Sequence, residues 1–255
     1  MRIRRGLFVT LAVAAAAALG AAAIAVGAPD GNSSTAKVKV FPKKLPKKKR
    51  KPAKLLTHVS TDYAHPAVKP QGGFVKRTQI WYDDDGKINT KGIPKCTKNL
   101  ANTTMGQAMA LCGKAKVGSG TAVATSTQNA SIKNCVLVFN GPKKGGKPTV
   151  LLHTRVQGTN CDKPKGNNSG SLTILLTGVI KPASGDYGNQ LDVKNIDSAP
   201  LPLKDFKATV GGGNSKYIKA RCHDKDHTLN AKAKFTYSDG QSDTVKSKST
   251  CEVKH

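Results

Sequence analysis

The chain has 255 residues and a formal net charge of +27 at pH 7, and only 5% of its residues are aromatic. A hydrophobic core must therefore consist mainly of aliphatic side chains, and this length allows one large all-β domain. Lys far outnumbers Arg, so the charge favours unspecific attraction to polyanions and argues against sequence-specific nucleic-acid recognition, for which Arg supplies the bidentate contact.

Residues 1–28 have the pattern of a secretory signal peptide, with a basic start, an apolar stretch and small residues at its end. This pattern predicts a protein that is secreted or associated with the cell envelope, outside the cytoplasmic membrane. An uncleaved membrane anchor is the alternative, and it is disfavoured because the apolar stretch is mostly Ala. We expect residues 29–36 to form a flexible lead-in and residues 37–255 to form one domain.

A basic run at residues 43–54 separates the first two predicted strands. Residues 37–40 alternate Lys with Val and residues 55–63 resume a β-type pattern, so the run is expected to be a loop between strands. The loop is either a contact for polyanions or a solvated segment, and the second is commoner for runs of charge. Its candidate polyanion-binding residues are Lys43, Lys44, Lys47, Lys48, Lys49, Arg50, Lys51 and Lys54.

The rest of the chain is predicted to be strands with one short helix. Apolar residues recur at helical spacing only near residues 98–111. Short segments of strand length, separated by turn residues, indicate a disulfide-stapled two-sheet β-sandwich. The expected strands lie at residues 74–82, 116–125, 134–140, 149–156, 172–180, 191–193, 205–210, 231–237 and 244–253, with a further one starting at Tyr217.

Six cysteines in an exported chain favour disulfides over a zinc site, because the compartment is oxidising and no C-x-x-C pair is present. Pairing of sequence neighbours closes loops for which a stabilisation of about 3 to 4 kcal/mol each is typical. Other connectivities remain open. The neighbouring pairs are Cys96 with Cys112, Cys135 with Cys161, and Cys222 with Cys251.

Several segments together resemble a group of exported actinobacterial β-sandwich proteins that have no assigned activity. They are a leader, a Lys/Pro-rich loop near the N-terminus, two cysteines followed by K-V-G-S-G-T-A, K-P-A-S-G-D-Y-G at residues 181–188, D-F-K-A-T-V-G-G from residue 205, and A-K-F-T-Y-S-D-G before the last cysteine. The resemblance implies export and a β-sandwich. It implies no functional residue.

Two clusters resemble metal sites. The segment C-H-D-K-D-H at residues 222–227 holds two imidazoles and two carboxylates, but a disulfide at Cys222 would remove one ligand. Residues 83–86, D-D-D-G, lack the spacing of a calcium-binding loop and favour a capped β-turn. We therefore predict no metal and no cofactor.

The sequence favours a non-enzymatic structural or binding protein that contacts anionic wall polymer or lipid headgroups through its lysines, with at most peripheral membrane contact. No G-x-S-x-G motif is present, and the single Glu argues against a pair of catalytic glutamates. The alternative is a carbohydrate-active or other hydrolase on the same scaffold. Catalytic aspartates gathered in one concave pocket would distinguish it.

Overall fold

The computed structural model describes residues 32–63, 73–125, 131–156, 173–199, 201–212, 215–223 and 227–254. The expected signal peptide and residues 29–31 of the expected lead-in lie outside these residues. Among the described residues, no helix has the length and the apolar character needed to cross a membrane.

In the part of the chain that the structure describes, eleven antiparallel strands form the main sheet, and five short strands form two small sheets. The main strands, in sheet order, are β1 (Ser33–Phe41), β4 (Lys54–Asp62), β12 (Leu203–Gly211), β7 (Lys116–Thr125), β8 (Ser131–Lys144), β9 (Lys147–Val156), β10 (Thr173–Pro182), β11 (Tyr187–Lys194), β5 (Val75–Asp83), β14 (Thr228–Tyr237) and β15 (Ser242–Thr250). The short strands are β2 (Lys44–Pro46), β3 (Lys51–Pro52), β6 (Gly86–Ile88), β13 (Ile218–Ala220) and β16 (Glu252–Lys254). The strand predicted from residue 37 begins at Ser33, so residues 33–36 belong to β1 and not to a lead-in.

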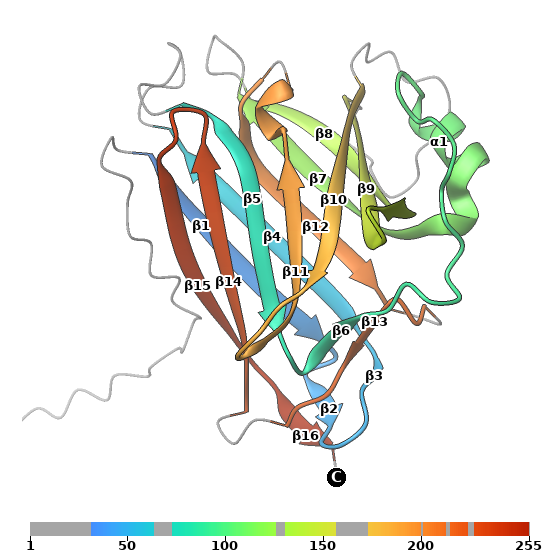
Figure 1. Ribbon diagram of the computed structural model, residues 1–255, viewed down its shortest axis with the longest axis vertical. Coiled ribbons are helices and arrows are strands. Elements are labelled where there is room, and N and C mark those ends of the chain that lie inside the picture. The colour runs from blue at the N-terminus through green and yellow to red at the C-terminus, as the bar shows by residue number, and fades with distance from the viewer. Residues whose placement is uncertain are drawn as a thin grey trace, which may run out of the picture.

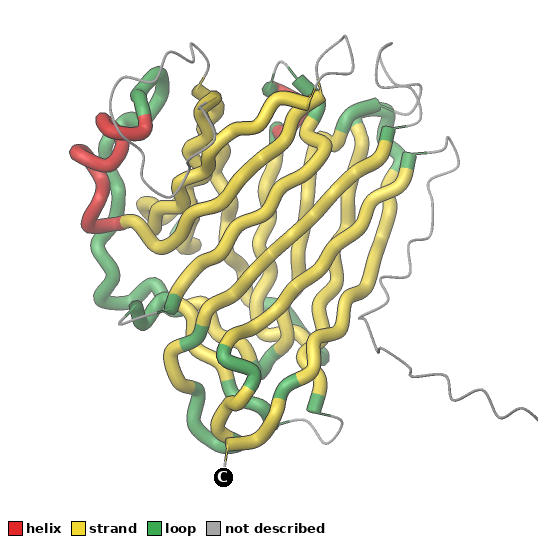
Figure 2. Tube along the Cα trace, turned by 180° about the vertical axis from the view of Figure 1, so that it is seen from behind, coloured by secondary structure: helices red, strands yellow, loops and turns green. Residues whose placement is uncertain are grey.

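The main sheet folds over itself, so that β15, β14, β5, β11 and β10 form one layer and β1, β4, β12, β7 and β8 form the other (Figure 1; Figure 2 shows the second layer from behind). The prediction of an all-β, disulfide-stapled fold with one short helix is confirmed. The two layers of the expected sandwich are two halves of one continuous sheet.

Alternating side chains build the core between the layers. In β14 every second residue from Leu229 to Tyr237 is buried, and β1 and β4 alternate in the same way. This is the period of two that a strand has when one face meets a core and the other meets water. The resulting core is mostly aliphatic, as the low aromatic content requires, and its fully buried rings include Tyr217, Phe235 and Tyr237.

The two edge strands β1 and β15 lie next to each other without forming a ladder of paired strands. A hydrogen bond crosses this seam from the backbone N–H of Val38 to the Ser247 hydroxyl, 3.2 Å away. The sheet is therefore closed at the seam by side chains and not by strand pairing.

Strands β7 and β12 approach each other very closely at two glycines. A Cβ at Gly118 would collide with the Thr209 carbonyl, and a Cβ at Gly120 would collide with the Lys207 carbonyl. Glycine inside a strand often marks such a close backbone approach. The K-V-G-S-G-T-A segment is thus a strand, as predicted, and its glycines are required by its neighbour.

A short helix, α1 (Met105–Cys112), packs on the outer face of β8 and β9 through a second, smaller core. It begins later than the predicted residue 98 because Thr104 caps its N-terminus in a capping box with Gln107. The Cys96–Cys112 disulfide ties the preceding loop to the helix end, and two 3₁₀ turns lie at Gly113–Ala115 and Ile196–Ser198.

Two of the three predicted disulfides are confirmed, Cys96–Cys112 and Cys222–Cys251. Cys161 of the third predicted pair lies outside the described residues, and Cys135 is fully buried in β8. Disulfides of this kind are typical of proteins in oxidising, non-cytoplasmic compartments.

Candidate functional site

The basic run joins β1 to β4, as predicted, but it is more ordered than a plain loop. Its residues form β2, which pairs in parallel with β16, and β3, which pairs with β13. Sheet β3–β13–β6 and sheet β2–β16 lie together at one end of the molecule, next to the C-terminus (Figure 1). The run is therefore held in place by two segments that are distant in sequence, β13 and β16.

Buried residues and backbone hydrogen bonds anchor the basic run. Leu45 and Ala53 are 1% and 2% exposed, so the run contributes to the core at both of its ends. Pro46 accepts a hydrogen bond from the N–H of Cys222, and Ala53 donates one to Ile218. Because Cys222 is tied to Cys251 just before β16, the disulfide and the basic run stabilise the same corner.

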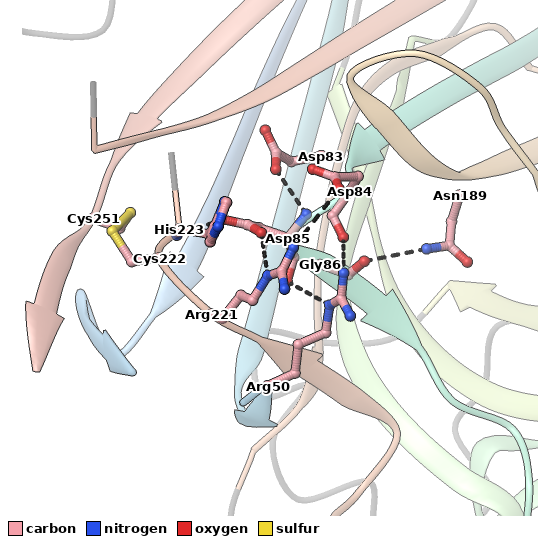
Figure 3. A network of polar contacts seen from close by, with 10 residues as sticks. All are labelled: Arg50, Asp83, Asp84, Asp85, Gly86, Asn189, Arg221, Cys222, His223 and Cys251. Atoms are coloured by element: carbon pink, nitrogen blue, oxygen red, sulfur yellow. Dashed lines mark hydrogen bonds and ion pairs between the residues drawn. A yellow bond between two sulfur atoms is a disulfide. The ribbon is translucent and has the colours of Figure 1, made fainter. Parts of the chain in front are cut away.

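Arg50 differs from the other cations of the run, because its guanidinium holds the turn between β5 and β6. It donates to the carbonyl oxygens of Asp84, at 2.5 Å, and Asp85, at 3.1 Å (Figure 3). These bonds use the planar fork that Lys lacks. Among the candidate polyanion-binding residues, Arg50 is thus a structural residue that is only partly exposed.

The carboxylates of the same turn are occupied by donors from the protein. Asp83 accepts from the N–H of Asp85 at 2.9 Å, which is the capped turn that was predicted, and from the N–H of Asn230 at 2.6 Å. Asp85 is fully buried and accepts from Arg221 at 2.5 Å and from the N–H of His223 at 2.6 Å. Figure 3 shows the contacts of Asp85 beside the Cys222–Cys251 disulfide.

The three aspartates lie close enough together to hold a cation, but their arrangement favours a structural network. A metal ion would have to displace the Arg221 guanidinium and three backbone N–H groups from the buried carboxylates. The neighbouring Cys222 is in a disulfide, as predicted, and cannot ligate a metal. Residues 224–226 of the C-H-D-K-D-H segment lie outside the described residues.

The other seven cations of the run are exposed, and folding brings three further lysines to the same end. Lys87 in β6 and Lys219 in β13 are cross-strand partners, and Lys254 lies in β16 opposite Pro46. We call this surface the basic end. It comprises Lys43, Lys44, Lys47, Lys48, Lys49, Lys51, Lys54, Lys87, Lys219 and Lys254.

Sequence reasoning missed Lys87, Lys219 and Lys254 because no local pattern marks them. Each is a single lysine on a short strand, and only the pairing of β6, β13 and β16 with their neighbours joins it to the run. The proximity of Lys254 to Cys251 was the one signal that could have indicated its place. Glu252, directly opposite Lys44, adds an exposed acid to the same surface.

A second feature is an apolar cavity of about 120 Å³ between the two layers. It is lined by side chains from both layers and by β6 and β13, and none of the described residues that line it is charged. The cavity lies inside the fold and does not include the residues of the basic run, apart from its neighbour Leu55.

No family model matches this chain, and it has no significant similarity to a curated protein or to a solved structure.

Proposed function

We propose that the protein is an exported, non-enzymatic cell-envelope or extracellular protein that binds anionic polymers or anionic lipid headgroups through its basic end. The observation that carries this proposal is the exposure of seven cations of the basic run on a segment that is held by two small sheets. A fixed set of cations loses less conformational entropy on binding than a flexible tail does.

The composition of the basic end supports an unspecific contact. Its ten residues are all lysines, which act as point charges, whereas the nearby Arg50 and Arg221 are engaged by the β5–β6 turn. Lysines attract phosphate, sulfate or carboxylate groups without selecting one geometry. The affinity should therefore increase with the charge density of the partner and decrease steeply as the salt concentration rises.

The hydrolase alternative receives less support from the geometry. Among the described residues, aspartates gather at residues 83–85, and the buried carboxylates of Asp83 and Asp85 already accept hydrogen bonds from Arg221 and from backbone N–H groups. A catalytic carboxylate needs to reach a substrate or a water molecule. This cluster is instead part of the scaffold that supports the basic end.

The test is retention of the mature chain on heparin and on anionic vesicles. The quadruple variant Lys47→Gln, Lys48→Gln, Lys49→Gln and Lys51→Gln leaves Arg50 in place, so the β5–β6 turn keeps its hydrogen bonds. We expect it to elute at clearly lower salt than the wild type. The slope of its salt dependence should be smaller by about one for each anionic group that a lysine no longer neutralises.

A control variant removes the same charge elsewhere on the surface. It carries Lys37→Gln, Lys39→Gln, Lys246→Gln and Lys248→Gln on the exposed faces of β1 and β15. Equal shifts for the two variants would show that net charge acts alone and would overturn the assignment to the basic end. Flow-through of the wild type at low salt would overturn polyanion binding altogether.

A further inference from the structure

An exposed aromatic ring adjoins the basic end. Phe41 is the last residue of β1 and is 40% exposed, because the side chain before it, Val40, takes the core side of the strand. Its cross-strand partner in β4 is Lys54, and the exposed Lys43 and Lys44 follow it closely in the chain. In Figure 1, β1 runs towards the end of the molecule that carries the two small sheets. The ring therefore borders the lysines of the basic end.

Exposed large hydrophobic side chains are rare in this molecule. In the part of the chain that the structure describes, they are Phe41 and Leu111. Leu111 lies on α1, in a separate part of the fold, whereas Phe41 pairs with a lysine of the basic end. A single exposed apolar residue needs no explanation by itself. Its position next to a fixed group of lysines is the observation that indicates a class of partner.

Lysine and phenylalanine suit two adjacent layers of an anionic lipid surface. The ammonium groups attract the phosphates of the headgroups, while the aliphatic stems of the lysines can lie along apolar surface. A Phe ring has no polar tip, so it gains free energy where it leaves water, as at the boundary between headgroups and acyl chains. An anionic polymer in water offers the charges without this apolar layer. The combination therefore favours lipid over polymer.

We infer that the basic end docks on an anionic lipid surface, with the lysines on the headgroup phosphates and the Phe41 ring inserted between the headgroups. This inference rests on the proposed function, because the lysines supply the attraction, and it narrows the partner to one class. A small apolar anchor alone binds lipid only marginally, and stable binding takes a second signal such as a cluster of cations. Salt screens the contribution of the lysines, whereas it does not screen the burial of the ring.

The test is co-sedimentation of the mature chain with vesicles of equimolar phosphatidylglycerol and phosphatidylcholine over a range of salt concentrations. The expected signal peptide is left out because its apolar stretch would bind lipid by itself. We expect Phe41→Ser to bind about tenfold more weakly than the wild type at each salt concentration, because the burial of part of a Phe side chain is lost. The slope of its salt dependence should equal that of the wild type, since no charge changes.

Two further variants locate the contact. Leu111→Ser removes the exposed apolar side chain on α1, so it should leave vesicle affinity unchanged. Phe41→Trp should bind vesicles at least as tightly as the wild type, because Trp suits the interface between membrane and water. All three variants should elute from heparin at the same salt concentration as the wild type, which would show that the lysines keep their places.

The outcomes separate this inference from the proposed function. Heparin retention of the wild type without vesicle binding would overturn docking on lipid and leave polyanion binding in place, whereas loss of both would overturn both. Wild-type vesicle affinity of Phe41→Ser, or weaker vesicle binding of Phe41→Trp, would overturn insertion of the ring. An equal loss for Phe41→Ser on heparin and on vesicles would overturn the preference for lipid. An equal loss for Leu111→Ser and Phe41→Ser would overturn the assignment to the basic end.

Discussion

At the scale of single residues, Asp85 connects several parts of the scaffold through its buried carboxylate and its carbonyl oxygen. It binds Arg221 and the N–H of His223, while its own carbonyl accepts from Arg50 and from the N–H of Arg221. One residue thus joins the β5–β6 turn, the basic run and the segment before the Cys222 disulfide. Neutralising it would take from the partly buried Arg221 guanidinium the carboxylate that it contacts at 2.5 Å.

We expect Asp85→Asn to lower the free energy of unfolding by about 3 kcal/mol, because it breaks a buried ion pair on one side only. Asp84→Asn in the same turn is the matched control, since the Asp84 side chain is 49% exposed and lies 3.9 Å from Arg221. The control should change stability by less than about 0.5 kcal/mol. Urea denaturation measures both, and equal destabilisation of the two variants would contradict a special role for Asp85.

His153 provides a second residue whose burial has a measurable consequence. It is fully buried under the loop before α1, where its Nε2–H donates to the carbonyl of Thr103 at 3.1 Å and its Nδ1 has no partner among the described residues. Burial, and then the nearby charge of Arg155, lower the pKa of His153 below its ordinary value of 6.5, although its backbone hydrogen bonds act in the opposite direction. The folded protein therefore keeps this imidazole neutral.

As the pH falls, His153 is protonated in the unfolded chain at a higher pH than in the folded protein. The stability that comes from keeping His153 neutral is therefore present above about pH 6.5. It is lost as the pH falls from there towards the lower pKa of the folded state. We expect His153→Gln to lose less stability than the wild type between pH 7.5 and pH 5.5. Urea midpoints at the two pH values test this. A wild type and variant with the same pH dependence would show that His153 does not titrate in this way.

At the scale of elements, the close approach of β7 and β12 depends on glycine. We expect Gly120→Ala to destabilise the fold by about 3 kcal/mol or to prevent folding, because the added methyl group would meet the Lys207 carbonyl. Gly113→Ala is the control, since Gly113 has helical dihedral angles and an added Cβ would make an ordinary 3.5 Å contact with Met109. Thermal unfolding of the two variants measures the difference, and a stable Gly120→Ala protein would contradict the close approach.

The elements also show which parts of the fold the sequence predicts. Alternation predicted β1 and β14, because each strand has one buried face and one face towards solvent and its side chains therefore alternate with a period of two. The helix was predicted too long, because apolar residues before Thr104 belong to a loop that packs on the same small core. Over a few residues, apolar side chains that a loop buries can have the same spacing in sequence as those of a helix.

At the scale of the whole molecule, the candidate site was predictable only in part. The basic run itself can be recognised in the sequence. The sequence does not show that seven of its cations are exposed lysines while Arg50 is structural, because this difference depends on where Asp84 and Asp85 lie after folding. The cavity could not be predicted from the sequence. Aliphatic residues that face the core have the same sequence pattern whether their side chains pack tightly against each other or leave a cavity between them. Its position emerges from how eleven strands curve around one another.

The seam between β1 and β15 has a further consequence for the solution behaviour of the molecule. Exposed sheet edges are places where a second chain can add a strand, and natural proteins protect them with lysines. Here the two edges lie beside each other, and Lys37, Lys39, Lys246 and Lys248 project into solvent along them. Part of the large positive charge thus acts as mutual repulsion between copies, which keeps the seam from becoming a template for aggregation.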